Sequence, residues 1–238
     1  MPSISLVMPA YNEADNIEPM VAEATPALEA NADDYEIIVV DDGSADETAA
    51  VTRRVMETHP HVRLVQHPVN RGFGAAVFSG FTSAEKDWIF YTDADRQFVL
   101  SELERFVPYL EEADLIAGYR APRRDPFLRV FYGKGWSALC TLVFGYTVRD
   151  VDCGFKLFRR EIIQHLAPQI ASRGATFSIE WLVRAKRAGY RFVELPVSHR
   201  PRVAGSQTGA NINVIVRAFR ELVQFRMQLW REGKPDDR

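Results

Sequence analysis

The sequence has few cysteines, no long apolar run and no strong charge of either sign. Only Cys140 and Cys153 occur among 238 residues, without the spacing of a metal site, so we expect reduced thiols rather than a disulfide framework. The formal net charge of −3 gives no global attraction to nucleic acid, which we do not expect as a partner. No uncharged run exceeds 14 residues. A membrane-spanning helix needs about 20 apolar residues, so we expect no span. The reduced thiols favour a cytoplasmic protein.

Short apolar segments alternate with segments of helical periodicity along the first half of the chain. This alternation predicts an α/β fold with a mostly parallel sheet flanked by helices and right-handed crossovers. After residue 119 basic and aromatic clusters follow, and the chain ends in an amphipathic helix. No linker is visible, so we expect one domain over 1–232, with halves at 1–118 and 119–232 and a disordered tail at 233–238. The expected strands are 4–8, 35–40, 62–66, 87–92, 115–118 and 191–197, and the expected helices are 14–30, 46–57, 72–84, 101–111, 176–188 and 211–230.

Two carboxylates and an amide follow the apolar segment that ends near Tyr91. They are Asp93, Asp95 and Gln97. Polar side chains at the carboxyl end of a strand in an α/β sheet lie where such sheets bind ligands. Hard oxygen ligands on a short loop suit Mg²⁺ or Mn²⁺ shared with substrate phosphates. An Asp-x-Asp pattern alone is more often a solvated turn, so a metal site needs a second observation.

Two upstream junctions show the same arrangement. Asp41 and Asp42 follow the apolar run at 35–40, and polar residues at 9–13 follow the apolar run at 4–8. Either junction alone is an ordinary connection between a strand and a helix. Turn chemistry alone does not explain three strand ends with the same bias, so they predict a ligand site at one edge of the sheet.

Five motifs in order resemble those of the family 2 inverting glycosyltransferases, which have the Rossmann-like GT-A fold. The resemblance runs from residue 4 to about 220, and it points to the polyprenyl-phosphate branch typified by dolichol-phosphate mannose synthase. It implies transfer of a hexose from a nucleotide sugar, GDP-mannose or UDP-glucose, to a polyprenyl or dolichyl phosphate. The motifs are Pro9-Ala10-Tyr11-Asn12-Glu13, Asp41-Asp42-Gly43-Ser44, Arg71-Gly72-Phe73-Gly74-Ala75-Ala76, Asp93-Ala94-Asp95-Arg96-Gln97 and Asp152-Cys153-Gly154-Phe155-Lys156.

The resemblance implies roles on the donor side. Asp93, Asp95 and Gln97 match metal ligands, and Mg²⁺ or Mn²⁺ there would stabilise the departing nucleoside diphosphate, which makes Asp95 catalytic. Gly72 and Gly74 open a helix whose N-terminus favours phosphate, although a bare Gly-x-Gly is a weak signal. Tyr11 either lines the base pocket or is a packed core aromatic. The residues expected to contact the nucleotide sugar are Pro9, Tyr11, Glu13, Asp41, Asp42, Arg71, Gly72, Gly74, Asp93, Ala94 and Glu180.

The resemblance also implies an anionic acceptor steered by cations. Arg120 and Arg202 match arginines near the acceptor phosphate, and Arg129 is a looser match. Asp152 lies near the general base of other family 2 branches, or it orients an arginine or the sugar. We expect Arg120, Arg202 and Asp152 to act in catalysis. Any one of these arginines, and Glu180 likewise, could equally be an ordinary surface residue.

A basic and aromatic segment suggests how such a chain reaches a lipid. Residues 120–134 contain five basic residues and one acid, and residues 127–146 are rich in aromatic and aliphatic side chains. This composition favours an amphipathic helix at a membrane surface, or a helix that covers the sheet with its basic side chains reaching water. We expect a peripheral protein on the cytoplasmic face of the membrane, with or without a separate membrane-anchoring protein.

Two alternatives stay open. One is a soluble family 2 transferase with a saccharide or protein acceptor, which would not float with anionic liposomes. The other is a catalytically silent nucleotide-sugar binding subunit, against which the intact Asp93-Ala94-Asp95 argues.

Overall fold

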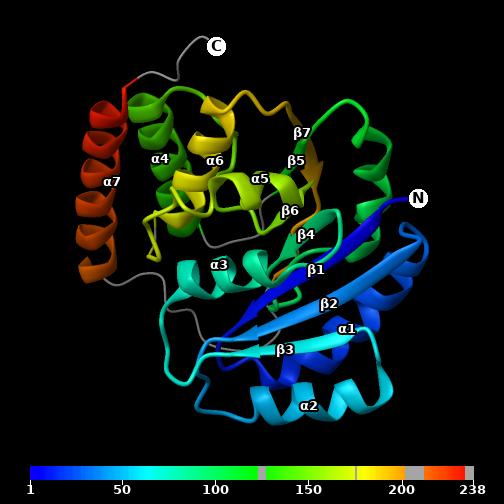
Figure 1. Cartoon of the computed structure of the whole chain (residues 1–238). Coiled ribbons are helices and arrows are strands. Elements are labelled where there is room, and N and C mark those ends of the chain that lie inside the picture. The colour runs from blue at the N-terminus through cyan, green and yellow to red at the C-terminus, as the bar shows by residue number, and fades with distance from the viewer. Residues whose placement is uncertain (123–126, 175, 202–211, 234–238) are drawn as a thin grey trace.

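Figure 1 shows a computed structural model, which describes residues 1–122, 127–174, 176–201 and 212–233. Arg123, Arg124 and Arg202 therefore lie outside the described residues, as does the predicted tail at 233–238 except for Gly233. The strands are β1 (Ser3–Ala10), β2 (Asp34–Asp41), β3 (Val62–Gln66), β4 (Trp88–Thr92), β5 (Leu115–Arg120), β6 (Phe155–Arg159) and β7 (Phe192–Val197). The helices are α1 (Ala14–Glu29), α2 (Thr48–Thr58), α3 (Phe73–Ser83), α4 (Phe127–Phe144), α5 (Arg160–Leu166), α6 (Phe177–Arg187) and α7 (Ile212–Glu232).

One sheet takes strands from both halves of the chain, in the order β3-β2-β1-β4-β6-β5-β7. All neighbouring strands are parallel except β6, which runs antiparallel to β4 and β5. The predicted α/β class with a mostly parallel sheet is thus confirmed. The reversed strand matters for function, because its first residue, Phe155, pairs with Thr92 at the end of β4. The loop before β6 therefore lies at the same edge as the loops after β1, β2 and β4.

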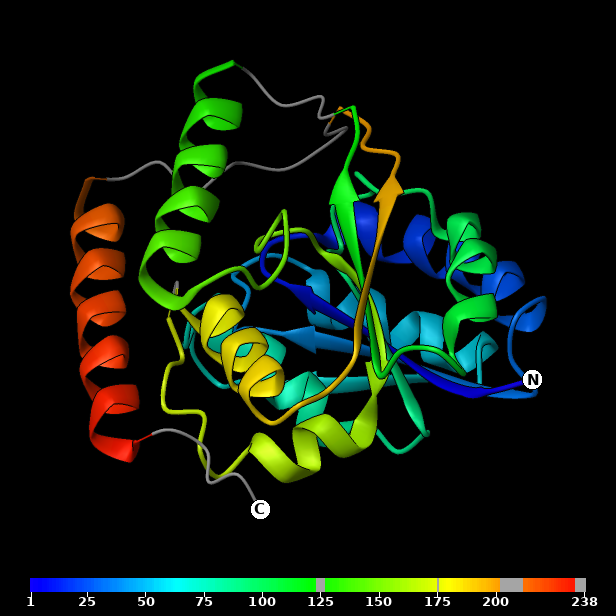
Figure 2. The same ribbon diagram turned by 90° about the horizontal axis from the view of Figure 1, so that it is seen from above.

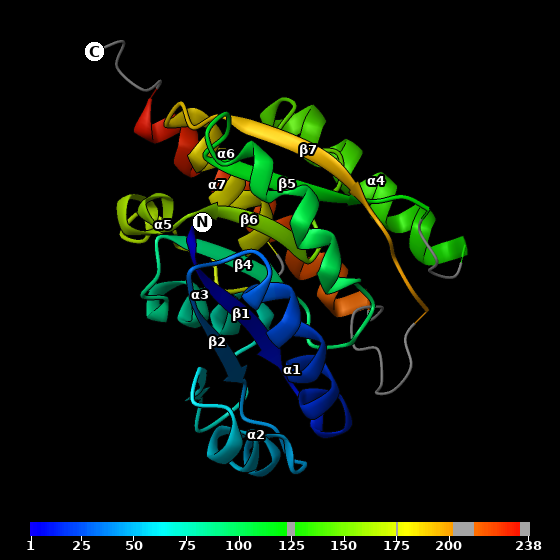
Figure 3. The same cartoon turned by 90° about the vertical axis from the view of Figure 1, so that its right-hand side faces the viewer.

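Successive side chains of each strand point to opposite faces of the sheet, so a hydrophobic core forms on each face. Leu6 of β1 and Ile37 of β2 face α1 and α2, whereas Val7 and Ile38 face α3. Helices α5 and α6 extend this second core with Ile162 and similar residues. Figures 2 and 3 show the sheet between these two layers of helices. The strands are buried on both faces and rich in β-branched residues, as expected of a parallel sheet that helices cover on both sides.

The expected helix over 101–111 is wrong. The structure has two short 3-10 helices there, η1 (Leu100–Arg105) and η2 (Val107–Tyr109). Pro108 explains the difference, because it has no N–H with which to continue an α-helical ladder. Helix α5 and strand β6 follow each other directly and were not among the expected elements.

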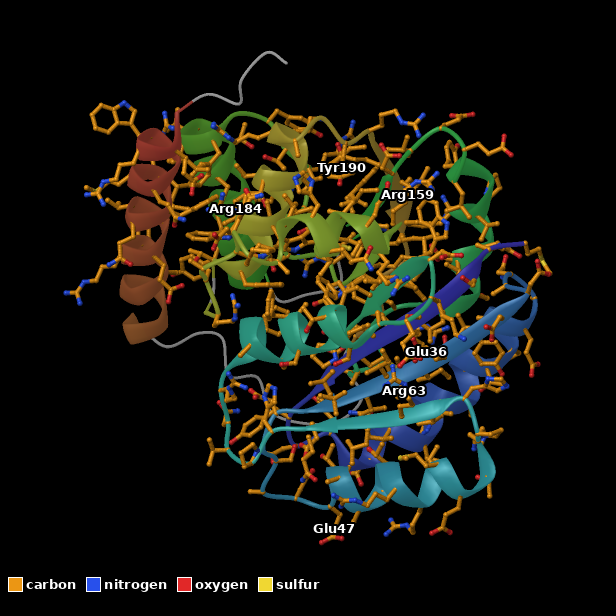
Figure 4. All side chains as sticks on the ribbon, in the orientation of Figure 1. Glu36, Glu47, Arg63, Arg159, Arg184 and Tyr190 are labelled. Atoms are coloured by element: carbon orange, nitrogen blue, oxygen red, sulfur yellow. The ribbon has the colours of Figure 1, made fainter. Side chains whose placement is uncertain are left out.

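The C-terminal helices pack on each other outside the second layer. Phe144 of α4 lies 5.0 Å from Phe225 of α7 between ring centroids, and Trp136 lies 6.3 Å from Phe219. On α6, Arg184 donates both terminal nitrogens to Glu232 of α7 at 3.0 and 3.1 Å (Figure 4). Across the described parts of the chain, no helix has the length and apolarity to span a bilayer.

A buried polar network around Glu36 lies near the amino ends of β1, β2 and β3 (Figure 4). Glu36 of β2 accepts hydrogen bonds from the Ser5 hydroxyl at 2.6 Å and from the Glu85 N–H at 2.7 Å. The guanidinium of Arg63 on β3 donates to its other oxygen at 2.7 Å. These contacts satisfy a carboxylate that is only 6% exposed, and they join three neighbouring segments.

Candidate functional site

The loops after β1 and β2 are joined by hydrogen bonds. Asn12 has a left-handed φ of 55°, and its side-chain oxygen accepts the Ala45 N–H at 2.9 Å. The N–H of Asn12 donates to the Ser44 hydroxyl at 2.9 Å, and the N–H of Glu13 donates to the Thr48 hydroxyl at 2.9 Å. The two loops therefore form one structural unit at the carboxyl edge of the sheet.

Tyr11 projects from this unit and is 41% exposed. The alternative that it is a packed core aromatic is therefore wrong, and its ring is accessible to a ligand. Pro9 is half-buried within β1, where it pairs with Val40. Glu13 is buried, and its carboxylate accepts the Asn16 side-chain amide at 2.6 Å. Of the three residues predicted here, Tyr11 is the one that is most open to solvent.

The two carboxylates at the end of β2 have different surroundings. Asp42 accepts the N–H groups of Arg71 and Gly72 at 2.9 and 2.8 Å, and its Oδ1 lies 2.6 Å from Nδ1 of His67. Asp42 thus fixes the loop that opens α3. One oxygen of Asp41 accepts the Ser44 N–H at 3.0 Å, while its Oδ2 is buried without a hydrogen-bond partner within the described ranges. Of these two carboxylates, Asp41 therefore has an oxygen that could accept a further hydrogen bond.

The glycine turn before α3 packs against a loop from the second half of the chain. A Cβ on Gly74 would lie 2.6 Å from the carbonyl oxygen of Gly174, so this glycine is explained by close packing of two backbones. Gly72 has a φ of 94°, which few residues other than glycine adopt. Arg71 is exposed beside the turn. The Arg71 side chain is therefore placed to meet a phosphate, whereas the N–H groups of residues 71 and 72 already donate to Asp42.

Arg173 lies near Arg71 and was not predicted as a site residue. Its guanidinium lies 3.6 Å from the ring centroid of Phe78 on α3. Burial and the neighbouring Arg71 lower the pKa of Arg173, against an opposite effect of Glu180. Two neighbouring cations beside the amino end of α3 form a region suited to a phosphate group. No sequence motif marks Arg173, because it approaches Phe78 and Arg71, which lie 95 and 102 residues earlier in the sequence.

The loop after β4 holds the predicted metal ligands. Asp95 is 9% exposed and accepts the Gln97 N–H at 3.2 Å, while the Gln97 side chain donates to the Arg200 carbonyl at 3.1 Å. Asp93 is half-buried and neighbours Gly154 of the loop before β6. Ala94 is buried in the core, so its methyl group does not face the edge where a nucleotide would bind.

The donor set of this loop fits a hard divalent cation. Two carboxylates and an amide lie within five residues of one turn, and oxygen is the ligand atom that Mg²⁺ and Mn²⁺ take. In the part of the chain that the structure describes, no group of three or more His, Cys, Asp or Glu residues could hold a metal. Since Mg²⁺ commonly takes one or two carboxylates and completes its shell with substrate phosphates, this set suits an ion shared with a diphosphate.

Arg120 already has a carboxylate partner. Its Nε and Nη2 donate to the two oxygens of Asp150, each at 2.7 Å, and both side chains are largely buried. Desolvation lowers the pKa of Arg120, but the hydrogen bonds that Arg120 donates to this carboxylate outweigh that effect and raise the pKa. The guanidinium fork expected to bind an acceptor phosphate therefore holds the loop before β6. Asp150 was missed by sequence reasoning, because a single Asp after Arg149 has no distinguishing pattern.

The other residues predicted for the acceptor side divide into two groups. Asp152 is exposed on the loop before β6, at the edge that carries Asp93. Arg129 lies on α4, but its side chain is outside the description, as is the whole of Arg202. The predicted acceptor roles of Arg129 and Arg202 stay predictions.

Glu180 is buried, and its carboxylate accepts hydrogen bonds from other parts of the protein. It is 1% exposed, and its two oxygens accept the N–H groups of Ala171 and Ser172 at 3.0 and 2.7 Å. Arg184 donates to the same carboxylate at 3.1 Å. These contacts explain Glu180 as the residue that shapes the loop carrying Arg173, and the sugar contact predicted for Glu180 stays a prediction.

Comparisons with known proteins agree with this arrangement. The sequence profile described as "Glycosyl transferase family 2" matches residues 5–167. A dolichyl-phosphate beta-glucosyltransferase of Trichomonas vaginalis is 33% identical over 95% of this chain and 72% of its own length. An undecaprenyl-phosphate 4-deoxy-4-formamido-L-arabinose transferase of Enterobacter sp. (strain 638) is 31% identical over 85% of this chain, which spans 61% of that protein.

A solved structure supports the fold. Glucosyl-3-phosphoglycerate synthase from Mycobacterium tuberculosis, in complex with Mn²⁺, uridine diphosphate and glucosyl-3-phosphoglycerate, superposes with a TM-score of 0.68. The alignment covers 99% of this chain and 82% of that one, at 21% identity. The sheet order, the loops gathered at one edge and these matches lead to one conclusion: the chain belongs to glycosyl transferase family 2 and has the GT-A fold.

Proposed function

We propose that the protein transfers a hexose from a nucleoside-diphosphate sugar to a polyprenyl phosphate. One observation carries the proposal: the loops after β1, β2 and β4 and the loop before β6 meet at one edge, which brings Tyr11, Asp41 and Asp95 from three strand ends to the same side as Asp152. Dolichyl phosphate and undecaprenyl phosphate stand in the names of the two relatives, which supports a lipid acceptor.

On the donor side, this chain supplies an aromatic ring, acceptors and cations. Tyr11 would stack on the base and Asp41 would accept a hydrogen bond from the nucleoside, since Asp42 is committed to the backbone of 71–72. Arg71 and Arg173 would face the diphosphate. Asp93, Asp95 and Gln97 would hold Mg²⁺ or Mn²⁺, which supplies Lewis-acid stabilisation of the leaving diphosphate when bound.

The proposed reaction is a single displacement. An oxygen of the lipid phosphate forms a bond to the anomeric carbon, the bond from that carbon to the diphosphate breaks, and the nucleoside diphosphate leaves with the electron pair. A phosphate monoester is already anionic near neutral pH, so steering matters more than proton removal. Asp152 is exposed at the edge and would orient the sugar or an incoming group, while Arg120 holds its loop through Asp150.

The outer face of α7 supports a site at a membrane surface. Helix α7 lies at the periphery in Figures 1 and 2, and it presents exposed apolar side chains three or four residues apart. Both of its acids have partners on neighbouring segments, because Glu221 accepts the Thr176 hydroxyl and Glu232 accepts Arg184. An exposed surface with apolar and basic residues suits anionic lipid. Its exposed members are Phe219, Arg220, Val223, Arg226, Met227, Trp230 and Arg231.

We place this peripheral attachment on the cytoplasmic face, directly or through a separate membrane-anchoring protein. The test combines flotation with anionic liposomes and transfer from labelled UDP-glucose and GDP-mannose to undecaprenyl phosphate in the presence of Mn²⁺. We expect labelled lipid from the wild type and none from Asp95→Ala. Transfer only to saccharide or protein acceptors would overturn the lipid proposal, and nucleotide binding without any transfer would indicate a silent binding subunit.

A further inference from the structure

We propose that Tyr91 and Gly154 are positioning residues that fix the carboxylate of Asp93 and thereby set the affinity of the site for its divalent ion. This inference rests on the proposed function, because that function assigns Asp93 to the metal. Neither residue would touch the ion. Their role follows from contacts on the two sides of one carboxylate.

Tyr91 holds one side of this carboxylate. Its hydroxyl donates to Oδ1 of Asp93 at 2.9 Å. The Tyr91 side chain is 5% exposed and its ring packs at 5.6 Å, centroid to centroid, against Phe81 of α3. The buried, packed ring therefore directs its hydroxyl hydrogen bond at one carboxylate oxygen.

Gly154 limits the other side. A Cβ built on this glycine would lie 2.2 Å from Oδ2 and 2.6 Å from Cγ of Asp93. Gly154 does not have a left-handed φ, so its backbone conformation does not itself require glycine. The requirement for glycine comes from the space that the Asp93 carboxylate fills. Asp93 is thus confined between a hydroxyl group and a backbone Cα.

Lys156 keeps this backbone in place. It is 2% exposed, pairs with Tyr91 across β4 and β6, and donates through Nζ to the carbonyl oxygens of Val151 (3.1 Å) and Cys153. The turn that carries Gly154 is therefore tied to the strand beneath it. A side chain larger than hydrogen at position 154 would displace the carboxylate rather than the turn.

The first test is Tyr91→Phe, with Tyr35→Phe as the matched control. Tyr35 also donates its hydroxyl to a carboxylate, Glu29 at 3.4 Å, on a strand end away from the site. Loss of a group that orients a metal ligand commonly weakens metal affinity by about 10–100-fold. We expect Mn²⁺ binding in the presence of nucleoside diphosphate, measured by electron paramagnetic resonance of free Mn²⁺, to weaken at least about tenfold in Tyr91→Phe and not in Tyr35→Phe. Raising the Mn²⁺ concentration should restore transfer.

The second test is Gly154→Ala, with Gly135→Ala as its control. A Cβ on Gly135 of α4 would meet no heavy atom within 4 Å. We expect Gly154→Ala to lose Mn²⁺ binding by more than Tyr91→Phe does, since it displaces the carboxylate instead of releasing it. Metal-free binding of the nucleoside diphosphate and the melting temperature of Tyr91→Phe should stay close to those of the wild type.

The outcomes separate the two proposals. A wild type that binds nucleoside diphosphate but no Mn²⁺ overturns the metal assignment in the proposed function. A wild type that binds Mn²⁺, together with a folded Tyr91→Phe that binds it equally well, overturns the positioning role of Tyr91. Wild-type Mn²⁺ affinity in a folded Gly154→Ala overturns the role of Gly154. If Gly154→Ala does not fold, Tyr91→Phe decides alone.

Discussion

At the scale of single residues, the structure redistributes roles among charged groups that the sequence presents as equivalent. Asp41 and Asp42 are adjacent, yet Asp42 fixes the backbone before α3 and Asp41 keeps a buried oxygen without a partner among the described residues. Arg120 has the charge expected of a phosphate ligand, yet its fork is bound to Asp150. Such assignments depend on which groups meet in space, and spacing along the chain does not contain that information.

The Arg120–Asp150 pair gives a prediction at this scale. Breaking a buried ion pair by removing one partner commonly costs about 3–5 kcal/mol. We expect Arg120→Ala and Asp150→Ala each to lower the free energy of unfolding by this order, measured in urea. The double variant should lose clearly less than the sum, because the two changes remove one interaction. Additive losses would show that the pair is not coupled, and that Arg120 has its main role elsewhere.

At the scale of elements, strand β6 was not predicted, the other strands were, and the partner of each strand was not. Those other strands and the helices that alternate with them follow from apolar periodicity, and the resemblance of the motifs points to the correct fold. The reversal of β6 depends on long-range pairing with β4 and β5, and it is this reversal that brings Gly154 to Asp93. In the segment around Pro108, by contrast, a helix was predicted from an apolar pattern of helical period and did not form. Pro108 lacks the backbone N–H that an α-helix needs there.

The Glu36 network predicts a pH dependence of the edge formed by β2 and β3. Burial alone would raise the pKa of Glu36, but hydrogen bonds from Ser5, from the Glu85 N–H and from Arg63 lower it below its model-compound value of 4.5. A carboxyl whose folded pKa is depressed contributes stability that is complete above the unfolded pKa and is lost as the pH falls through the folded one. We expect Glu36→Gln to be less stable than the wild type at pH 7, with a difference that shrinks below about pH 4. Urea denaturation at several pH values measures this difference, and a constant gap would contradict the assignment.

Helix α7 gives a prediction for membrane attachment. Met227 and Trp230 are exposed on its outer face, and Trp230 is 79% exposed. Burying one large apolar side chain contributes about 1.5–3 kcal/mol, so we expect Met227→Glu and Trp230→Ala each to weaken liposome binding by about tenfold or more. Met56→Glu on α2, where the methionine is also exposed, is the control and should bind as the wild type does. Equal binding by all variants would place the attachment on another segment, such as residues 120–146.

At the scale of the whole molecule, the sequence predicted more of the fold than of the candidate site. The five motifs specify the family, and the family specifies the sheet, so the architecture follows from short segments. The groups that support the site, such as Arg173 and Tyr91, come from segments that meet only after the sheet forms. Their residue types are common in cores and on surfaces, which is why sequence patterns did not single them out.

Stabilisation by ligand tests the whole site at once and identifies the donor. A ligand at a concentration of 100 times its Kd stabilises the folded state by about 2.7 kcal/mol. For a chain of this size, each kcal/mol raises the melting temperature by roughly 2–4 °C. With Mn²⁺ present, we expect one nucleoside diphosphate from a panel that includes UDP and GDP to raise the melting temperature by roughly 5–10 °C at saturation. The shift should shrink in Asp95→Ala and when Mn²⁺ is chelated, since the ion is proposed to bridge the protein and the diphosphate. An equal shift of the melting temperature without Mn²⁺ would contradict the metal site. It would mean that Arg71, Arg173 and the amino end of α3 bind the diphosphate by themselves.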